Sequence, residues 1–537
     1  MQTVSRIDEW KQAHKKTLLN ESFVEVSLDI ADPESVADAS REDAMKDNGA
    51  IYISDSRHLT DGLDNSPTPY CTLEQNLWCL DGGRKAIPDS GYKDECYVGD
   101  VLSNDTCIFD MKYPTLTIDF SKVFTVLIPG VTITWSKVYG EFADTFEVIA
   151  YNGSTIVASK EVTNNRSITS IVLSDIINYN RIEIIIKKWC LPYHRARVEE
   201  IFVGARKVYG KTDLFDFSHT QSADPASLSL PKTEISFSVD NVDGEYNPHN
   251  SNGLAKYLTE RQEVKTRYGL KMDDGTIEWV KGGTFYLSEW YAKQNGITAD
   301  FVARDLLECL STTYVEKPAI TTRTLYSLAQ MLLVSAELPL TNDGKQRWLI
   351  DESLKGIETN APLPEDTIAN LLQLIANAGM CVMYQDRDGI LHIEPLKDEK
   401  IDYEINAFNS YSKSEITFSK PIQKVTVRAY QYSNNGNDST YVLLGERFGM
   451  SGEIIEIDNP LVTNTNHATS ICQWITSILV GRRTLDFSWR ADVRLDVLDR
   501  IINTNSYGSR TVRMTEVNYK FNGAFRATGK GKVMGDG

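Results

Sequence analysis

The seven histidines of this 537-residue chain are the first residues to consider for metal or catalytic chemistry. No two lie within four residues of each other, so the chain lacks the His-Glu-x-x-His spacing that places two imidazoles on one helix face to bind zinc. No Gly-x-Ser-x-Gly segment precedes a predicted helix, which removes the usual nucleophile elbow. These observations predict no metal ion, no cofactor and no enzymatic activity. The histidines are His14, His58, His194, His219, His249, His392 and His467.

Acidic side chains offer two further kinds of chemistry. Asp386, Asp388 and Glu394 suggest a calcium loop, but the run lacks an alternating third ligand and a glutamate at the twelfth position. The same residues are interpreted as a solvated hairpin turn. Carboxylate pairs for glycoside hydrolysis depend on a separation in space that a sequence does not give. A cell-wall hydrolase therefore stays among the hypotheses.

Three aromatic and two arginine residues form the only candidate recognition site in the sequence: Trp78, Trp189, Tyr193, Arg195 and Arg197. Aromatic faces stack on sugars, and arginine forks bind hydroxyl or carboxylate groups, so one interpretation is contact with a glycan or a partner protein. The other interpretation is structural. The aromatic rings would close the ends of a β-sandwich, and the arginines would pair with Glu199 or Glu200.

Five of the eight cysteines fall between Cys71 and Cys190. Their spacings match no Cys-x-x-Cys zinc signature. One or two disulfides are possible in an oxidising environment, but in a chain that folds in the cytosol buried free thiols are the favoured interpretation.

The stretch from about Thr233 to Leu310 organises the predicted fold. Ile235, Phe237 and Val239 alternate with polar residues, the pattern of a strand with one buried face. Asp-Gly and Asn-Gly pairs at 274–275 and 295–296 are typical of hairpin turns. The stretch therefore predicts a meander of strands that forms part of a small barrel.

A string of short motifs in this stretch resembles the first barrel of the phage tail hub family, the baseplate hub and tail-tip proteins of bacterial viruses and related particles. It runs in the order Asn-Val-Asp-Gly-Glu-Tyr-Asn-Pro at 241–248, Gln262-Glu263-Val264, Gly282-Gly283-Thr284-Phe285-Tyr286-Leu287 and Ala303-Arg304-Asp305-Leu306-Leu307. The resemblance implies two similar barrels with a small α/β domain between them. It also implies a homotrimer whose near-sixfold ring adapts a hexameric tail tube to a threefold tip.

A second all-β unit is predicted from the regular spacing of short strands, which is typical of a sandwich or jelly roll. Within it, Val131-Thr132-Ile133-Thr134-Trp135 and Arg181-Ile182-Glu183-Ile184-Ile185-Ile186 resemble discoidin-like carbohydrate-binding domains. The predicted strands are 116–120, 131–135, 145–151, 155–162, 168–173 and 181–187.

Apolar residues at helical spacing around 325–336 and 368–376, followed by a hairpin, predict the α/β part. The predicted fold class is mainly β with this small α/β part, two hub-type barrels and an inserted jelly-roll-like sandwich. The predicted domains are an N-terminal arm at 1–20, a first barrel at 21–64 plus 207–310, the sandwich at 65–206, the α/β domain at 311–414 and a second barrel at 415–537. The strand at 21–30 is assigned to the barrel because one strand alone is not stable.

Composition limits the functional classes. A net charge of −18 argues against binding nucleic acid. It is compatible with a channel through which DNA passes, because an acidic wall repels phosphate. No apolar run reaches the ~20 residues of a membrane span, and the charged N-terminus has no apolar core of a secretory signal. We expect a protein made in the bacterial cytoplasm and built into a virion tail or tail-like particle.

Three hypotheses follow from the sequence. The first is a structural, trimeric tail hub, whose partners are other copies, tail tube or distal tail proteins, and a tail spike or tip protein. The second is an adhesin whose inserted sandwich binds a host-surface glycan. The third is a tail-associated peptidoglycan hydrolase, which we do not expect because the sequence ends at the second barrel, leaving no room for a hydrolase domain.

Overall fold

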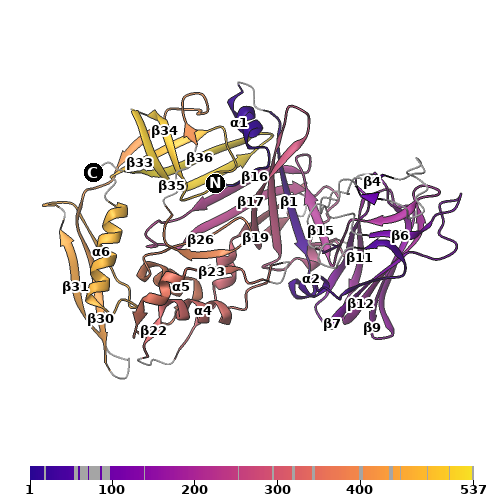
Figure 1. Cartoon of the computed structure of the whole chain (residues 1–537), viewed down its shortest axis with the longest axis horizontal. Coiled ribbons are helices and arrows are strands. Elements are labelled where there is room, and N and C mark those ends of the chain that lie inside the picture. Colours follow the sequence, from indigo (N-terminus) through magenta and orange to yellow (C-terminus); the bar gives the residue numbers. More distant parts are fainter. Residues whose placement is uncertain are drawn as a thin grey trace.

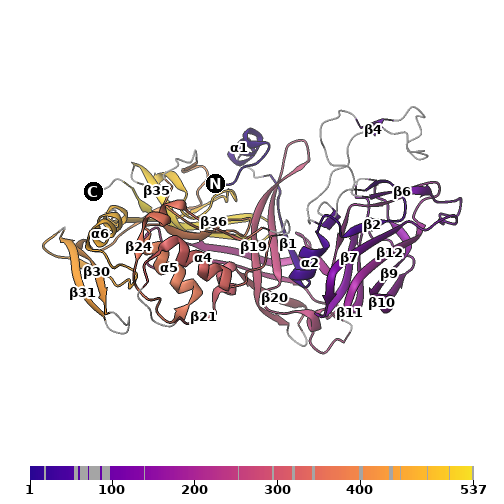
Figure 2. The same ribbon diagram turned by 60° about the horizontal axis from the view of Figure 1, so that its bottom comes forward.

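A computed structural model describes the chain in residues 1–16, 20–53, 59–60, 70–71, 85–86, 97–137, 139–251, 253–292, 296–316, 321–341, 345–397, 403–433, 439–447, 449–479, 482–506 and 508–534. The molecule is elongated and mainly β (Figure 1). A sandwich forms one end, a large sheet occupies the centre, and a small sheet with a helix forms the opposite end (Figures 1 and 2). As predicted, helices are few and short. Those described are α1 (Ile7–Lys15), α2 (Pro33–Ala39), α4 (Leu325–Ser335), α5 (Ile368–Ala378) and α6 (Thr465–Leu479), with 3-10 turns η1 (Ala255–Tyr257), η2 (Leu306–Leu310) and η3 (Glu352–Gly356).

The central sheet has thirteen strands in the described part of the chain. Its main path, in spatial order, is β15 (Ala205–Tyr209), β1 (Ser22–Ile30), β18 (Glu263–Lys271), β19 (Ile277–Ala292), β20 (Thr298–Arg304), β17 (Lys232–Asp240), β16 (Leu214–Ser222), β35 (Gly508–Phe521), β36 (Phe525–Val533), β33 (Arg483–Trp489) and β29 (Glu415–Phe418). The short strands β28 (Glu404–Ile405) and β34 (Arg500–Ser506) join it beside β35. Buried and half-buried residues alternate along β17, as the period-2 pattern predicts.

One strand, β16, joins the two halves of this sheet. Phe217 on β16 lies opposite Phe237 on one side and Phe521 on the other. The segments predicted to be two separate barrels therefore share a single hydrogen-bonded sheet and one hydrophobic core. The Asp-Gly pair at 274–275 lies between the paired strands β18 and β19, while Asn295 lies outside the described residues. Such turn signals carry no information on which outer strands meet.

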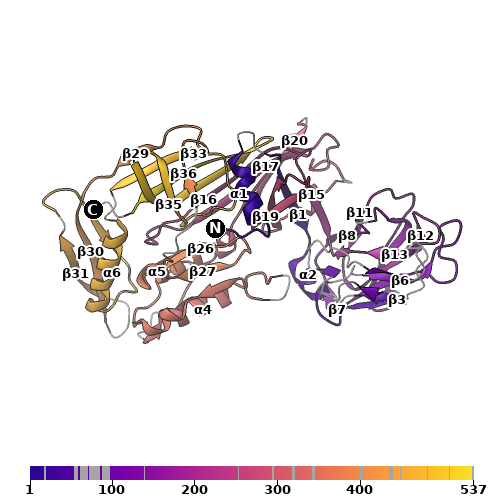
Figure 3. The same cartoon turned by 45° about the horizontal axis from the view of Figure 1, so that its top comes forward.

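The N-terminal helix packs on this sheet (Figure 3). Trp10 of α1 is fully buried in the sheet's core, and its indole N–H donates to Asp492 Oδ1 at 3.2 Å. The N-terminal arm predicted at 1–20 contains this helix, which is docked on the same chain because Trp10 is buried in its apolar core.

The sandwich is built from sheets that lie against one shared core. The strands are β2 (Met45–Asp47), β3 (Ala50–Ile53), β6 (Tyr97–Leu102), β7 (Thr115–Phe124), β8 (Ile128–Thr134), β9 (Ala143–Asn152), β10 (Thr155–Val162), β11 (Thr169–Ile176), β12 (Tyr179–Trp189), β13 (Arg195–Val198) and β14 (Glu200–Phe202), with a separate pair β4 (Tyr70–Cys71) and β5 (Lys85–Ala86).

The boundaries predicted for this unit need correction at its start. The prediction placed residues 31–64 with the first barrel, yet β2 pairs with β7 and β3 pairs with β6 inside the sandwich. The chain leaves the central sheet at Ile30 and returns at Ala205, and these two residues are partners across β1 and β15. The sequence did not reveal the strands in this segment, because residues 31–48 are mostly polar and β2 is too short to give an alternating pattern.

The α/β part lies below the central sheet in Figure 1, and α4 and α5 pack in a second hydrophobic core. Its strands are β21 (Thr313–Tyr314), β22 (Arg323–Thr324), β23 (Trp348–Ile350), β24 (Glu358–Thr359), β25 (Asp366–Thr367), β26 (Val382–Gln385) and β27 (Leu391–Glu394). The same core contains β30 (Ile422–Tyr432), β32 (Glu453–Ile457) and α6, with β31 (Ser439–Arg447) beside them.

The segment 415–537, predicted as one barrel, is therefore divided. Residues 422–457 form a separate three-stranded sheet, ordered β31-β30-β32, covered on one face by α6. Residues from β33 onward return to the central sheet. The division was hidden because both parts show the same alternation of apolar and polar residues. Among the described residues, no helix is long and apolar enough to cross a membrane.

Candidate functional site

Trp189, the first of the recognition candidates, lies in the interior of the sandwich. Its side chain is fully buried and its indole meets Trp135 edge-on, with ring centroids 6.0 Å apart. The indole N–H donates to Glu141 Oε2 at 2.8 Å. His194 Nδ1 lies 2.8 Å from the other oxygen of the same carboxylate. Trp189 therefore closes the sandwich core, and Glu141 provides the hydrogen-bond partner that a buried indole N–H needs.

The two candidate arginines also point inward. Arg195 is 7% exposed and donates to the carbonyl oxygens of Gly99 and Asp100 on β6. Arg197 is 6% exposed, and its guanidinium lies over the Tyr139 ring, 4.6 Å from the centroid. These contacts hold β13 against its neighbours, so neither arginine is available to a ligand at the surface.

Tyr193 differs from the other described candidates because its side chain is 52% exposed. It sits at a positive φ of 60° in the turn after β12, where its backbone N–H donates to Ser103 O at 3.0 Å. Trp78 lies outside the described residues. The structure thus brings Trp189, Arg195 and Tyr193 to one end of the sandwich, but it presents Tyr193 alone of the described candidates to solvent.

Five cysteines are free thiols: Cys107, Cys190, Cys309, Cys381 and Cys472. Burial raises the pKa of Cys190 and Cys309 to about 11 and that of Cys381 to about 12. These three thiols are therefore neutral and poorly nucleophilic near pH 7. Cys79 and Cys96 lie outside the described residues. No three His, Cys, Asp or Glu side chains in the described ranges are grouped to hold a metal ion.

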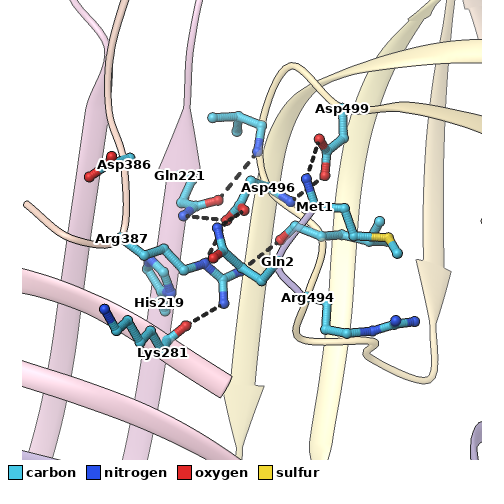
Figure 4. Close-up of polar contacts among 12 residues, drawn as sticks. Met1, Gln2, His219, Gln221, Lys281, Asp386, Arg387, Arg494, Asp496 and Asp499 are labelled. Atoms are coloured by element: carbon cyan, nitrogen blue, oxygen red, sulfur yellow. Dashed lines mark hydrogen bonds and ion pairs between the residues drawn. The ribbon is translucent and has the colours of Figure 1, made fainter. Parts of the chain in front are cut away.

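A buried polar junction joins the α/β part to the central sheet (Figure 4). Arg387, in the hairpin between β26 and β27, is 5% exposed and donates from Nε to Asp496 Oδ1 at 2.7 Å. Its other nitrogens donate to the carbonyl oxygens of Lys281 at 2.7 Å and Leu495 at 3.0 Å. Burial raises the pKa of Asp496, but the Arg387 charge, the N-terminal amine and the hydrogen bonds from Gln2 and Arg387 together lower it overall. Of the residues interpreted as a solvated hairpin turn, Asp388 is exposed, whereas Glu394 is buried, as is Arg387 within the turn.

His219 lies close to this junction, in the core of the central sheet (Figure 4). Its Nδ1 is 2.8 Å from the Tyr268 hydroxyl, and its ring meets Phe285 edge-on at 5.3 Å. Burial lowers the pKa of His219 to about 3, and the nearby Arg387 charge acts in the same direction. The imidazole is therefore neutral near pH 7 and serves packing and one hydrogen bond.

A second charged junction links the sandwich to the central sheet. Arg206 on β15 donates from Nε and Nη2 to the two oxygens of Asp29 on β1, at 2.7 and 2.9 Å, and also pairs with Glu200. Lys265 pairs with Glu263 at 2.7 Å, and Arg347 of the α/β part pairs with the same carboxylate.

A cavity of about 290 Å³ adjoins this second junction. Its walls come from α2, the β18 and β19 strands and the chain after α4, and they include Tyr286 and Cys309. Tyr286 is 1% exposed, and burial raises the pKa of its hydroxyl well above the usual value. Arg206, Lys265 and Arg347 are each paired with Asp29 or Glu263, so the arrangement supports joining of the three parts rather than acid–base chemistry.

Sequence reasoning missed both junctions. Arg387, Asp496, Arg206 and Asp29 are single charged residues in ordinary turns and strands. Nothing in their local spacing distinguishes them from solvated charges. The signal that they share is contact across segments more than 100 residues apart, which only the fold supplies.

No protein-family model matches the chain, and no curated protein matches it. Solved structures that align with it include the tail protein from Neisseria meningitidis MC58, at 10% identity over 61% of this chain and 93% of that one, with a TM-score of 0.43. The 43 kDa tail protein of prophage MuSo2 from Shewanella oneidensis aligns at 12% identity over 60% and 95%, with a TM-score of 0.42. Prophage tail protein gp18 from Listeria monocytogenes EGD-e aligns at 12% identity over 61% and 91%, with a TM-score of 0.37.

Proposed function

We propose that this protein is a structural hub of a phage tail or tail-like particle. The observation that carries the proposal is the central sheet, in which strands from 22–30, 205–304, 404–418 and 483–533 pack around one core. The hub-like string of motifs between 241 and 307 lies within this sheet and its first turns. Buried ion pairs fix the α/β part against the sheet, as a load-transmitting scaffold requires.

In this proposal three copies form a ring at the distal end of the tail. The ring adapts a hexameric tail tube above to a threefold tip below. Closed cyclic symmetry is the general way in which identical subunits satisfy all their contacts. The partners are other copies, the tail tube or distal tail proteins, and the spike or tip protein.

The direct test is the mass of the purified 60.4-kDa chain in solution. Light scattering across a concentration series should give three times the subunit mass, and micrographs should show rings. A chain that stays monomeric at the highest concentration and forms no rings contradicts the proposal.

A second candidate function concerns the sandwich, which we propose to carry a contact with a host-surface glycan or a partner protein. Tyr193, with Leu191 at 40% and Ile108 at 39% exposure, presents apolar surface on neighbouring loops of the sandwich. A version of the protein in which residues 31–204 are replaced by a short turn should still assemble but lose adsorption to host cells. If adsorption is unchanged, the sandwich is not the adhesin.

A further inference from the structure

Strand β31 is an unusual edge strand. It ends the sheet ordered β31-β30-β32, so one of its edges has no strand partner within the described ranges. Tyr441, Val442 and Leu443 are consecutive and are 51%, 45% and 46% exposed. Because successive side chains in a strand point to opposite faces, β31 exposes apolar groups on both faces as well as along its edge. Figure 1 places it at the end of the molecule away from the sandwich.

The usual protections of an edge are missing from most of β31, because its charged residues, Glu446 and Arg447, both lie at its last two positions. Natural sheets blunt their edges with lysine, proline or a bulge, which prevent unplanned strand pairing. The register of β31 with β30 runs from Arg447↔Lys424 to Ser439↔Tyr432 without a shift, and the strand contains neither lysine nor proline.

The edge strand β10 of the sandwich provides the contrast. It has a register shift between Ile156 and Ala158 and carries Lys160. Both features discourage pairing with another strand. The same chain therefore protects one exposed edge and leaves another ready to pair.

Charge also favours contact between copies at this end. The whole chain carries −18, which opposes close approach of identical molecules. Residues 419–483, which include β30, β31, β32 and α6, contain six Lys and Arg against five Asp and Glu. Self-repulsion is therefore weak where the unprotected edge lies.

The sheet also offers a receiving edge. β32 ends the sheet on its other side, again within the described residues, and its Ile454 is 57% exposed. An edge on each side of one sheet permits head-to-tail pairing, in which every copy uses both. Such a heterologous contact closes into a ring when the rotation between copies allows it.

We propose that β31 of one copy adds as a strand to the free edge of β32 of a second copy. Main-chain hydrogen bonds across the new pair supply the directional contact, and Tyr441, Val442 and Leu443 are covered on both faces. This inference rests on the proposed hub, because it specifies how the copies of that hub join.

The first test compares single lysine substitutions on exposed edge positions. Val442→Lys and Leu443→Lys should each raise the concentration at half-dissociation at least tenfold in light scattering. The matched control, Ile156→Lys on β10, changes a side chain that is 56% exposed and should leave the oligomer unchanged. Circular dichroism and the melting temperature should be the same for all three variants, because all three sites are at the surface.

The second test separates head-to-tail pairing from other contacts. Ile454→Lys should also dissociate the wild-type oligomer. An equimolar mixture of Val442→Lys and Ile454→Lys chains retains one intact β31 and one intact β32, so it should form dimers of twice 60.4 kDa but no ring. A mixture that stays monomeric overturns head-to-tail pairing.

Hydrogen exchange provides a readout without substitution. Amides of 439–447 in the wild-type protein should exchange at least tenfold more slowly above the association concentration than below it. Unchanged exchange, an oligomer that survives both β31 variants, or dissociation by Ile156→Lys as well, overturns the inference while the hub proposal stands. A wild-type chain that is monomeric at every concentration overturns both.

Discussion

The two ends of this molecule use apolar and aromatic residues in opposite ways. In the sandwich, Trp189 is turned into the core and Glu141 satisfies its indole N–H. At the other end, β31 presents Tyr441, Val442 and Leu443 to solvent. The residues whose types suggested recognition thus stabilise the fold, and an ordinary-looking strand supplies the exposed surface.

The difference teaches that residue type alone does not identify a contact surface. Tryptophan and arginine are enriched at interfaces, but both are equally suited to close a core when a carboxylate or a carbonyl group lies within reach. An edge strand needs no special residue to bind a partner, because its backbone provides the hydrogen bonds.

The largest effect expected from this contrast is that of Trp189→Ala. Removing a fully buried indole leaves a cavity, and we expect the sandwich to lose about 3–5 kcal/mol of unfolding free energy. Urea denaturation followed by circular dichroism measures this loss. Leu191→Ala, two residues away and 40% exposed, is the control and should change stability little. Full stability of Trp189→Ala with lost ligand binding would reverse our assignment of its role.

Glu141→Ala should have the next largest effect. It removes the acceptor of the buried Trp189 N–H, and such a buried unpaired donor costs about 1–3 kcal/mol. Glu161→Ala on β10, where the side chain is 49% exposed, is the matched control. Equal stability of the two variants in the same denaturation experiment would mean that the carboxylate does not stabilise the core.

A pH experiment isolates the central sheet from both ends. His219 has a folded pKa of about 3, below its unfolded value near 6.5, so the unfolded state binds a proton that the folded state excludes. Stability from this group is full above pH 6.5 and falls by about 1.4 kcal/mol for each unit of pH from there towards 3.

Calorimetry of His219→Gln tests this sign. The variant should lose less stability than the wild type between pH 6.5 and 4 in the transition of the central sheet. The transition of the sandwich in the same scans is the internal reference and should be unchanged by the substitution. An identical slope for variant and wild type would show that His219 is not the responsible group.

The smallest effect is expected for Tyr193→Ala. This side chain is 52% exposed and makes no core contact, so its removal should change unfolding free energy by less than about 0.5 kcal/mol. Adsorption to host cells or binding to a glycan array should fall if Tyr193 contributes to recognition. Unchanged binding would leave the sandwich end without a tested contact residue.

Much of the local structure followed from the sequence. The strand predicted at 155–162 matches β10, and the helices at 325–336 and 368–376 match α4 and α5, because periodicity depends only on neighbouring residues. The strand predicted at 21–30 matches β1, which pairs with β18 and β15. The joining of the two predicted barrel segments in one sheet did not follow, since strand pairing between β16 and β35 depends on contacts across about 300 residues of chain, which periodicity does not encode.

The candidate site was less predictable than the fold. Trp189, Arg195 and Arg197 were identified as chemically capable, and their burial depends on where Glu141 and the β6 carbonyl groups lie in space. Conversely, no residue pattern in β31 indicates a contact surface. Its exposure follows from α6 covering only one face of a sheet that ends there.

The adjacency of Ile30 and Ala205 has an evolutionary consequence. The chain departs and returns across a single pair of neighbouring strands, about 5 Å apart, so the 31–204 module resembles an interchangeable attachment. Recombination could exchange it for an unrelated module while the scaffold keeps every one of its own strands. Among proteins that share this scaffold, the 31–204 module would then diverge faster than the scaffold. Phylogenetic trees built separately from the module and from the scaffold would differ.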